Sequence, residues 1–575
     1  MIRLFVRLVL AVAIVVCPVT ARAFDVTLLH VNDTHSYLDP TTEKIAPQGK
    51  STYARLGGWA RLASAVDAVR AEHDNVILLH AGDAVQGGLY YMKYGGRPEM
   101  EFLDRLGFDA FALGNHEFDR GAPYLAGVLG HTRVPTVCAN LDATAVPALA
   151  ARVRPYVIIE RGGDKVGIVG LITPETKVLS APGNVKFSDS VHAANLIVRE
   201  LQARGVNKIV LLTHVGYEAD KRLAVAVSGV DVIVGGHSHT LLGNSEGIAA
   251  MGLRPAAAYP TVVKGADGND VYVVTAWKWA RVLGRLDMTF DDAGRVIRAE
   301  GKPLLILGDR FKRKNDAGQK VAVQGAERDE LLAFIAANSD AAVVPADPGA
   351  RKFLGPFSEG VEAMRTEVIG EAVLPLPHIR VPGTTDSGES LPHGSLIAPL
   401  VCRSMLARLK ATGEPADIAL QNAGGVRESV DEGHITMGTA YTLLPFNNTL
   451  VLLGLTGEQV RRTLETGVDL GGGAFLYTGG LRYTVDMRHP EGERVLFVDT
   501  LDNMGNWTPL DPARTYRVVT NSYLASGGDG FAILKSAVSS YDTGFVDAQA
   551  FIEYVRQQRM LKPLPTTGVT YIPEK

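Results

Sequence analysis

The stretch VTLLHVNDTH, residues 26–35, sets the pattern of the first half of the chain. Six residues rich in β-branched and aliphatic side chains are followed at once by polar Asn32, Asp33 and His35. A short apolar run of this kind is typical of a buried strand. Such runs alternate with amphipathic segments as far as about Ala299, and this alternation predicts an α/β domain. The further runs are residues 76–80, 110–113, 166–172, 209–213, 232–234 and 271–275.

The chain has 575 residues, which is too long for one ordinary domain. Residues 24–300 form the first predicted domain, and the charged stretch 301–345, with one helical piece at 326–338, is interpreted as a linker. A second α/β pattern occupies residues 346–575. Its predicted helices are 396–409 and 548–557, its strands are 418–421, 450–453 and 516–520, and Thr456 to Gln459 is a capping box that opens another helix.

The composition excludes several classes of protein. Hydrophobic residues make up 46% and charged residues 21% of the chain, which excludes a disordered chain and a multi-span membrane protein. The net charge of -4, without a long basic block, argues against nucleic acid as the main partner. Three cysteines are too few for a disulfide scaffold. We expect Cys138 and Cys402 to be buried free thiols, with a bridge between them left open.

The N-terminus carries the pattern of a Sec-type signal peptide, residues 1–23. Arg3 and Arg7 precede an apolar run, residues 8–16, and Ala21-Arg22-Ala23 supplies an A-x-A cleavage site. The alternative is a membrane anchor, but the run is short for a bilayer span. The sequence therefore predicts a periplasmic or secreted protein without stable membrane insertion. It does not specify the oligomeric state.

Polar side chains follow five of the predicted strands, at the point where each strand ends. In open α/β sheets the carboxyl ends of the strands share one edge, so these side chains should lie together. Each of them alone is equally compatible with a turn or a structural histidine. Their joint occurrence, with five of the 14 histidines of the chain, favours a metal site instead. The set is Asp33, His35, Asp83, Asn115, His116, His214, His237 and His239.

The donor types indicate which metals fit. Imidazole, carboxylate and one amide, without thiolate, suit Zn, Mn, Co or Fe. Two ions need about seven protein ligands with one shared carboxylate, and the set supplies them with Asp83 as the bridge. A metal pair roughly 3.5–4 Å apart clamps an in-line displacement and activates water. One metal would take Asp33, His35 and His239, and the other Asn115, His214 and His237.

These motifs resemble the calcineurin-like metallophosphoesterase signature, and more narrowly the 5′-nucleotidase / UDP-sugar hydrolase family. The second half of the chain agrees, with motifs similar to that family's at residues 422–427, 444–448 and 523–531. The resemblance implies an N-terminal four-layer α/β/β/α sandwich and a separate C-terminal α/β substrate-binding domain. It also implies two divalent metal ions, with Zn, Mn or Co preferred and Mg as a further option.

The resemblance assigns the nucleotide to the C-terminal domain. Phe446 and Tyr523 would sandwich the base, because stacking needs two flat faces. Arg427 would bind phosphate through its guanidinium fork. Taken without the resemblance, Phe446 is an ordinary core aromatic and Arg427 belongs to a surface turn. Asn422, Gly424 and Asp529 would contact the nucleoside, and Arg380 is a further phosphate-binding candidate, although the loop after it, residues 381–387, is enlarged relative to the family.

His116 follows the ligand Asn115 and is placed to stabilise the transferring phosphoryl group or to protonate the leaving oxygen. Asp119 would orient His116, or alternatively cap the next helix. The predicted activity is hydrolysis of nucleoside 5′-monophosphates. The alternatives are a 2′,3′-cyclic-nucleotide phosphodiesterase, a UDP-sugar hydrolase, a thiosulfohydrolase of the sulfur-oxidation branch, and a metal-binding surface adhesion protein without enzymatic function.

Overall fold

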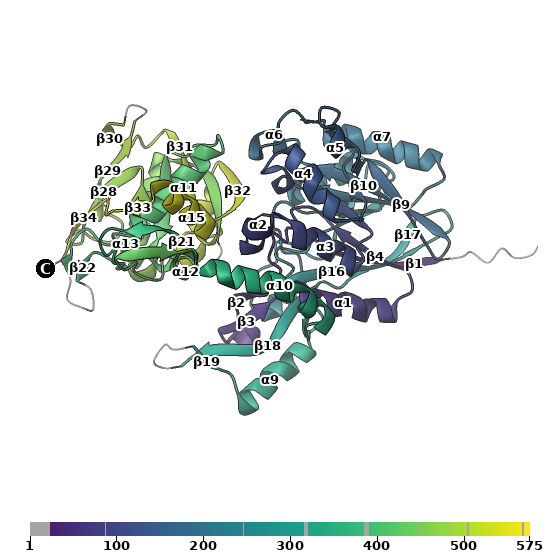
Figure 1. Ribbon diagram of the computed structural model, residues 1–575, viewed down its shortest axis with the longest axis horizontal. Helices are drawn as coiled ribbons and strands as arrows, with labels where there is room; N and C mark the ends of the chain where they lie inside the picture. The colour runs from purple at the N-terminus through teal and green to yellow at the C-terminus, as the bar shows by residue number, and fades with distance from the viewer. Residues whose placement is uncertain are drawn as a thin grey trace, which may run out of the picture.

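The computed structural model describes residues 23–574 apart from 87, 245, 316–319, 385–389, 447, 503–504 and 566–567. The predicted signal peptide, up to residue 22, lies outside the described residues. Two domains are joined by the helix α10 (Pro348–Arg365), as Figure 1 shows. Within the described ranges, no helix combines the length and apolarity that crossing a membrane requires.

Two sheets form the middle of the N-terminal domain. The central strands of the first run parallel, so that their carboxyl ends meet at one edge. The first sheet contains β2 (Thr41–Ile45), β3 (Thr52–Leu56), β18 (Leu304–Lys314), β16 (Val282–Phe290), β1 (Phe24–Val31), β4 (Val76–His80), β5 (Ala110–Ala112), β6 (Thr136–Val137) and β8 (Val153–Arg154), in that order. The second contains β14 (Thr261–Lys264), β15 (Asp270–Val274), β13 (Val232–Val234), β12 (Ile209–His214), β10 (Asp164–Ile172) and β9 (Tyr156–Arg161).

Alternating residues of each strand point to opposite faces of the first sheet. Leu28 and Leu79 pack with residues of the second sheet, whereas Leu29 and Leu78 pack with helices on the other side. These helices are α1 (Trp59–Glu72), α3 (Arg97–Leu106) and α4 (Ala122–Val128), while α7 (Ser190–Ala203) and α8 (Tyr217–Ala226) cover the second sheet. The four-layer α/β/β/α architecture is therefore confirmed.

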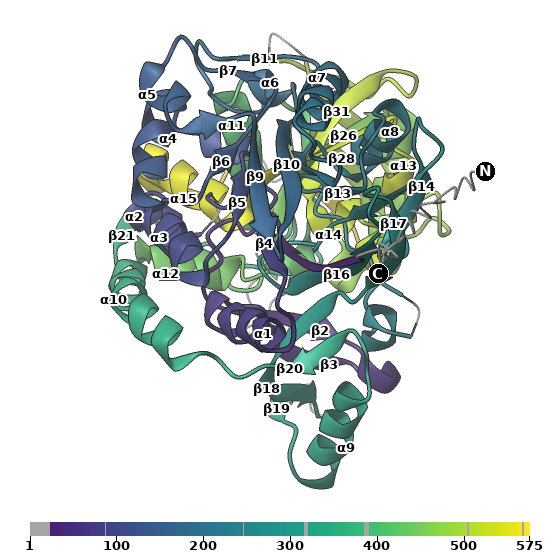
Figure 2. The same ribbon diagram turned by 90° about the vertical axis from the view of Figure 1, so that its right-hand side faces the viewer.

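The stretch interpreted as a linker is not one. β18 pairs with both β3 and β16, and β20 (Ala341–Val343) pairs with β18. Leu305, Ile306 and Leu307 are fully buried. The charges that suggested a linker belong to the exposed far half of β18 and to the helix α9 (Gly325–Ala336). Figure 2 shows these elements beside β2 and β3 at one end of the N-terminal domain. The connection between the domains is α10, whose first turn is capped by Asp347.

The C-terminal domain is built on a five-stranded sheet, as a second α/β pattern predicts. β24 runs parallel to β31, so their carboxyl ends lie side by side. Thr456 and Gln459 form the predicted capping box at the start of α13 (Gly457–Leu470). Cys402 and Cys138 are buried and unpaired, as expected. The sheet order is β27 (Leu476–Gly479), β24 (Ile418–Asn422), β31 (Thr515–Asn521), β26 (Thr449–Thr456) and β32 (Ser539–Val546), with α11 (Ala398–Ala411) and α15 (Asp547–Gln558) packed against each other beside it.

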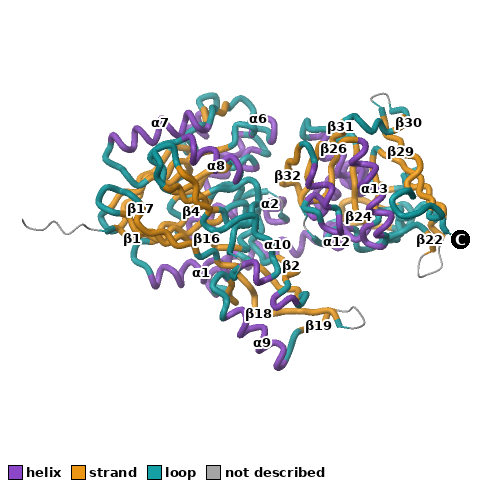
Figure 3. The backbone as a smooth tube through the Cα atoms, turned by 180° about the vertical axis from the view of Figure 1, so that it is seen from behind, coloured by secondary structure: helices purple, strands orange, loops and turns teal. Residues whose placement is uncertain are grey.

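The strand β32 is the edge of this sheet that faces the N-terminal domain. Figures 1 and 3, which view the molecule from opposite sides, both place β32 at the boundary between the domains. A second sheet lies on the opposite, outer side of the C-terminal domain. It contains β30 (Trp507–Pro509), β29 (Val495–Leu501), β28 (Leu481–Asp486) and β34 (Val569–Ile572).

Candidate active site

The seven predicted metal ligands converge at the carboxyl edge of the two N-terminal sheets. They lie at or just after the ends of β1, β4, β5, β12 and β13, as the strand-end pattern predicts. Several of them sit on backbone with a positive φ, which is uncommon outside glycine and is typical of sharply turned functional loops. Those residues are Asp33, His35, Asp83, His237 and His239, with φ between 46° and 78°.

The ligands form two groups. In the first, His239 Nε2 lies 2.9 Å from His35 Nε2 and 3.5 Å from Asp33 Oδ1. In the second, His214 Nε2 lies 2.9 Å from Asp83 Oδ2, and His237 completes the cluster. Asn115 Oδ1 joins the second group, 2.9 Å from His237 Nδ1.

Asp83 lies between the two groups, because its Oδ2 is also 3.8 Å from His35 Nε2. Within each group the donor atoms lie within 4.8 Å of one another. The Nε2 atoms of His35 and His239 face each other, and two imidazole nitrogens in this arrangement can both bind one cation. The donor set thus fits two divalent ions, and carboxylate and imidazole without thiolate suit Zn, Mn or Co.

A buried carboxylate without an assigned role, Glu117, holds the loops of this site together. It accepts hydrogen bonds from the backbone N–H groups of Gly114 at 2.6 Å, Ala84 at 2.8 Å and Asp83 at 3.0 Å. Burial raises the pKa of Glu117 to about 7. The sequence signal was its place in the Gly-Asn-His-Glu motif, but only the structure shows that Glu117 positions both ligand loops.

Charge neighbours keep the shared carboxylate ionised. Burial alone would raise the pKa of Asp83, but His214 and His116 hold it well below its usual range. Burial likewise would lower the pKa of His214, yet Asp83 outweighs this effect and raises it. Asp83 is therefore available as an anionic ligand at neutral pH.

His116 and Asp119 make the predicted contact. His116 Nδ1 lies 2.8 Å from Asp119 Oδ2, and Ser180 donates a hydrogen bond to the other Asp119 oxygen at 2.8 Å. The next helix, α4, begins after Gly121, so Asp119 does not cap it. Burial would lower the pKa of His116, but Asp119 and Asp83 raise it to about 9.

The predicted nucleoside residues form a second cluster, in the C-terminal domain. Asn422 ends β24, Tyr523 follows the parallel strand β31, and both side chains contact Asp529. Asn422 Nδ2 donates to Asp529 Oδ2 at 3.0 Å, and the Tyr523 hydroxyl donates to Asp529 Oδ1 at 2.8 Å. The Tyr523 ring lies against Gly528, where a Cβ would come within 2.6 Å of ring carbons.

Phe446 and Arg427 extend this cluster. The Arg427 guanidinium lies 5.7 Å from the Phe446 ring centre and donates to the Gly424 carbonyl at 3.1 Å. Phe446 exposes 48% of its surface, so it is not the ordinary core aromatic that its sequence alone suggests. Tyr523 is similarly exposed, at 46%. Two large exposed rings beside buried polar groups suit an aromatic ligand.

Arg380 is exposed, and the nearby His378 is influenced by both Arg380 and Arg427. His378 donates its backbone N–H to Ser429, and its ring lies 3.1 Å from the Ala423 carbonyl. Burial, with Arg380 and Arg427, lowers the pKa of His378 to about 4, so its ring is neutral at pH 7. Both predicted arginines therefore lie close enough to His378 to oppose its protonation. Sequence reasoning gave His378 no role.

The two clusters do not meet. β32 covers the metal centre instead, with Asp542 Oδ2 3.5 Å from His239 Nδ1 and the Phe545 ring 5.6 Å from that of His116. Among the described residues, no contact links Phe446 or Tyr523 to the metal centre. In this arrangement the edge strand, and not the predicted base clamp, faces the two groups of metal-ligating residues.

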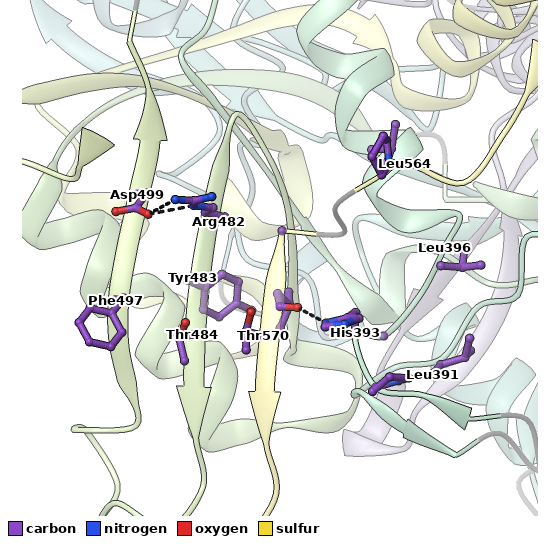
Figure 4. Close-up of a pocket in the computed structure, with 15 residues that line it drawn as sticks. Leu391, His393, Leu396, Arg482, Tyr483, Thr484, Phe497, Asp499, Leu564 and Thr570 are labelled. Carbon is purple, nitrogen blue, oxygen red and sulfur yellow. Dashed lines mark hydrogen bonds and ion pairs between the residues drawn. The ribbon is translucent and has the colours of Figure 1, made fainter. Parts of the chain in front are cut away.

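Two cavities of similar size lie in different places. One of about 540 Å³ borders the metal centre and is lined by His237, Tyr541, Thr173 and Arg222 among others. The other, about 560 Å³, lies on the outer sheet of the C-terminal domain between β28, β29 and β34 (Figure 4). Arg482 pairs with Asp499 at its edge, and it contains none of the predicted site residues.

Two family models match the chain. The model described as calcineurin-like phosphoesterase covers residues 26–241, and the model described as 5′-nucleotidase, C-terminal domain, covers residues 378–536. The first range contains all seven predicted metal ligands. The second contains the whole cluster around Asp529.

Similar proteins match nearly the whole length of the chain. A "Probable 5′-nucleotidase" of Treponema pallidum is 34% identical over 96% of this chain and 95% of its own length. The solved Haemophilus influenzae NAD nucleotidase is 30% identical, with a TM-score of 0.82 over 96% of this chain and 99% of that one. A 5′-nucleotidase precursor of Thermus thermophilus is 39% identical but has a TM-score of 0.58, over 96% and 100%. The Thermus thermophilus protein is thus more similar to this chain in sequence than the Haemophilus influenzae protein, but less similar in overall arrangement.

Proposed function

Because the chain belongs to the 5′-nucleotidase family and is a metal-dependent phosphoester hydrolase, we propose that it uses two divalent ions to release phosphate from nucleoside 5′-monophosphates. The observation that carries the proposal is the pair of three-residue metal groups, in which Asp83 of the second group lies 3.8 Å from His35 of the first. When bound, two such ions supply Lewis acidity at the phosphoryl oxygens and lower the pKa of the attacking water.

The side chains around the ions have separate tasks in this proposal. One ion would be held by Asp33, His35 and His239 and the other by Asn115, His214 and His237, with Asp83 contributing to both sites. His116 stabilises the transferring phosphoryl group or gives a proton to the leaving nucleoside oxygen. Support comes from its position directly beside Asn115 and from Asp119, which fixes its ring at Nδ1.

The nucleoside and phosphate would be bound by the C-terminal cluster. Phe446 and Tyr523 stack on the base, which their exposure permits. Asn422, Gly424 and Asp529 contact the nucleoside. Arg427 and Arg380 bind phosphate, since guanidinium groups match phosphate geometry.

A nucleotide held by this cluster must reach the metals, and β32 lies in the way. We infer that the C-terminal domain turns relative to the N-terminal domain during the reaction cycle. The single helix connection through α10 and the different overall arrangement of the Thermus thermophilus relative support this inference. The arrangement described above would be one that excludes nucleotide from the metal centre.

The N-terminal segment, residues 1–23, supports export of the protein from the cytoplasm. The N-terminal segment has the charge and apolar pattern of a cleaved signal peptide, and cleavage near Ala23 would leave β1 intact. We propose a periplasmic or secreted enzyme.

A second substrate class is favoured by one comparison. The solved relative with a TM-score of 0.82 is named an NAD nucleotidase, so a dinucleotide such as NAD is the second candidate substrate. Its pyrophosphate bond would be hydrolysed at the same metal centre.

The test is a substrate panel on metal-stripped protein, with Mn, Zn, Co or Mg added back. AMP, UMP, NAD, UDP-glucose, 2′,3′-cyclic AMP and p-nitrophenyl phosphate are compared by kcat/KM. We expect no turnover without metal and the highest kcat/KM with AMP or UMP. A preference for p-nitrophenyl phosphate over every nucleotide would reduce the proposal to a general phosphoesterase.

A further inference from the structure

β32 brings a carboxylate of the C-terminal domain to the metal centre. Asp542 Oδ2 lies 3.5 Å from His239 Nδ1, while the other ring nitrogen of His239 faces His35 and Asp33. A histidine that binds a metal through Nε2 carries its proton on Nδ1, and this proton needs an acceptor. His239 Nδ1 is buried and makes no hydrogen bond to any described residue, so Asp542 Oδ2 at 3.5 Å is its one ion-pair partner there. Asp542 is therefore the acceptor that the fold provides.

Asp542 is held in place by its own domain. Its Oδ2 accepts a hydrogen bond from the Thr449 hydroxyl at 2.7 Å, and its Oδ1 accepts one from the Gly544 backbone N–H at 3.0 Å. These two hydrogen bonds give the carboxylate a fixed orientation toward His239.

The neighbouring Gly544 shows that this contact is closely fitted. A Cβ at this position would lie 2.3 Å from His116 Nε2, and the backbone has a φ of +69°. Only glycine satisfies both conditions without moving the strand. The segment from Asp542 to Phe545 is therefore shaped to the surface of the metal centre.

We propose that Asp542 is a positioning residue that reaches across the domain boundary and orients His239 for one of the two metals. Carboxylates that accept the second N–H of a ligating histidine fix its ring and raise its basicity. The affinity of the site formed by Asp33, His35 and His239 then depends on where the C-terminal domain lies. By linkage, the metal in turn favours the arrangement in which β32 is docked.

This inference rests on the metal centre of the proposed function, and the experiment separates the two. Full-length protein is stripped and titrated with Zn²⁺ against a chromophoric chelator, which gives stoichiometry and both dissociation constants without turnover. Wild type should bind two ions. Asp542→Ala should weaken one site by about 10- to 100-fold and leave the other unchanged, as losses of such partners typically do.

Three further variants sharpen the test. Asp542→Asn keeps an acceptor oxygen without the charge and should give an intermediate affinity. Gly544→Ala should weaken the same site although Asp542 is intact, because the added methyl group pushes β32 away. Asp499→Asn removes a carboxylate that pairs with Arg482 on the outer sheet and should match wild type. Unfolding curves of each variant verify that it is folded.

Small-angle X-ray scattering supplies a second readout. Zn²⁺ should shift wild-type protein toward the docked arrangement and shift Asp542→Ala much less. Two sites of unchanged affinity in both Asp542→Ala and Gly544→Ala would overturn the inference while leaving the proposed function intact. Fewer than two ions bound by wild type would overturn the metal centre, and this inference with it.

Discussion

At the scale of single residues, the site depends on side chains that act through another side chain. Glu117 ties two ligand loops through three backbone N–H groups. Asp119 fixes the ring of His116 at Nδ1. Both acids make their hydrogen bonds inside the domain, which offsets the cost of removing a carboxyl group from water.

The proposed role of His116 leads to a kinetic prediction. General acid or charge-stabilising groups contribute typically 10²–10⁴-fold, so His116→Ala should lower kcat for AMP by about that factor. Because His116 is not among the metal ligands, the variant should still bind two ions per chain, measured by atomic emission on gel-filtered protein. His131→Ala, an exposed histidine of the same domain, is the matched control and should keep wild-type kcat. If His116→Ala loses metal but keeps its rate per bound ion, the residue is a ligand.

At the scale of elements, α3 carries an acid into the core. Glu99 lies in the first turn of α3 and is fully buried. Burial raises the pKa of Glu99 from 4.5 to about 7, with the Ser36 hydroxyl opposing the shift. The folded protein therefore holds a proton there that the unfolded chain has already lost between about pH 4.5 and 7.

The stability of the folded protein should therefore fall as pH rises through this window. Below about pH 4.5 Glu99 is protonated in both the folded and the unfolded protein, so the shift has no effect on the free energy of unfolding. Between about pH 4.5 and 7 the free energy of unfolding should decrease, by about 3 kcal/mol in total at pH 8. Glu99→Gln should remove this decline, so that the variant is more stable than wild type above pH 7. Urea unfolding at pH 5, 6, 7 and 8 measures the difference. Glu101→Gln, on the same helix and paired with Arg97, should keep the wild-type decline; identical curves for all three proteins would contradict the prediction.

At the scale of the whole molecule, the N-terminal domain extends further than its sequence pattern indicates. β18 lies between β3 and β16, so residues 304–343 complete the first sheet. Its residues Leu305 to Leu307 are fully buried, and each such side chain contributes about 1.5–3 kcal/mol. That sum is comparable with the total stability of a domain, about 5–15 kcal/mol.

A truncation pair tests this extension. A fragment of residues 23–345 should fold cooperatively and keep two metal ions. A fragment of residues 23–300 lacks β18 and β20 and should be unfolded or aggregated. Thermal unfolding by circular dichroism, with metal content, compares the two. A folded, metal-loaded 23–300 fragment would show that β18 is dispensable.

The division of labour between the domains gives the last prediction. Stacking is worth about 1–3 kcal/mol per base, or roughly 5- to 150-fold in affinity. Phe446→Ala and Tyr523→Ala should therefore lower the ratio of kcat/KM for AMP to that for p-nitrophenyl phosphate by such a factor. Phe497→Ala changes an aromatic that is 70% exposed on the outer sheet and should leave the ratio unchanged. An unchanged ratio in the first two variants would mean that these rings do not hold the base.

The sequence by itself determined the class of both domains and the gathering of the metal ligands. Parallel strands place their carboxyl ends at one edge, so Asp33 and Asp83 had to meet once β1 and β4 were identified as neighbours. His214 ends β12 in the second sheet, so its approach to Asp83 depends on how the two sheets pack. The capping box at Thr456 was equally local, because it depends on residues three apart in one turn. Such features follow from short-range patterns and need no knowledge of distant partners.

Only the tertiary structure decided the rest. Whether a charged stretch such as residues 301–345 is a linker or a strand depends on its partners β3 and β16, which lie far from it in sequence. The contact between Asp542 and His239 depends on how two domains dock, and no local pattern encodes the relative position of two bodies joined by one helix. The same holds for the exposure of Phe446, since burial is a property of the packed chain and not of the residue.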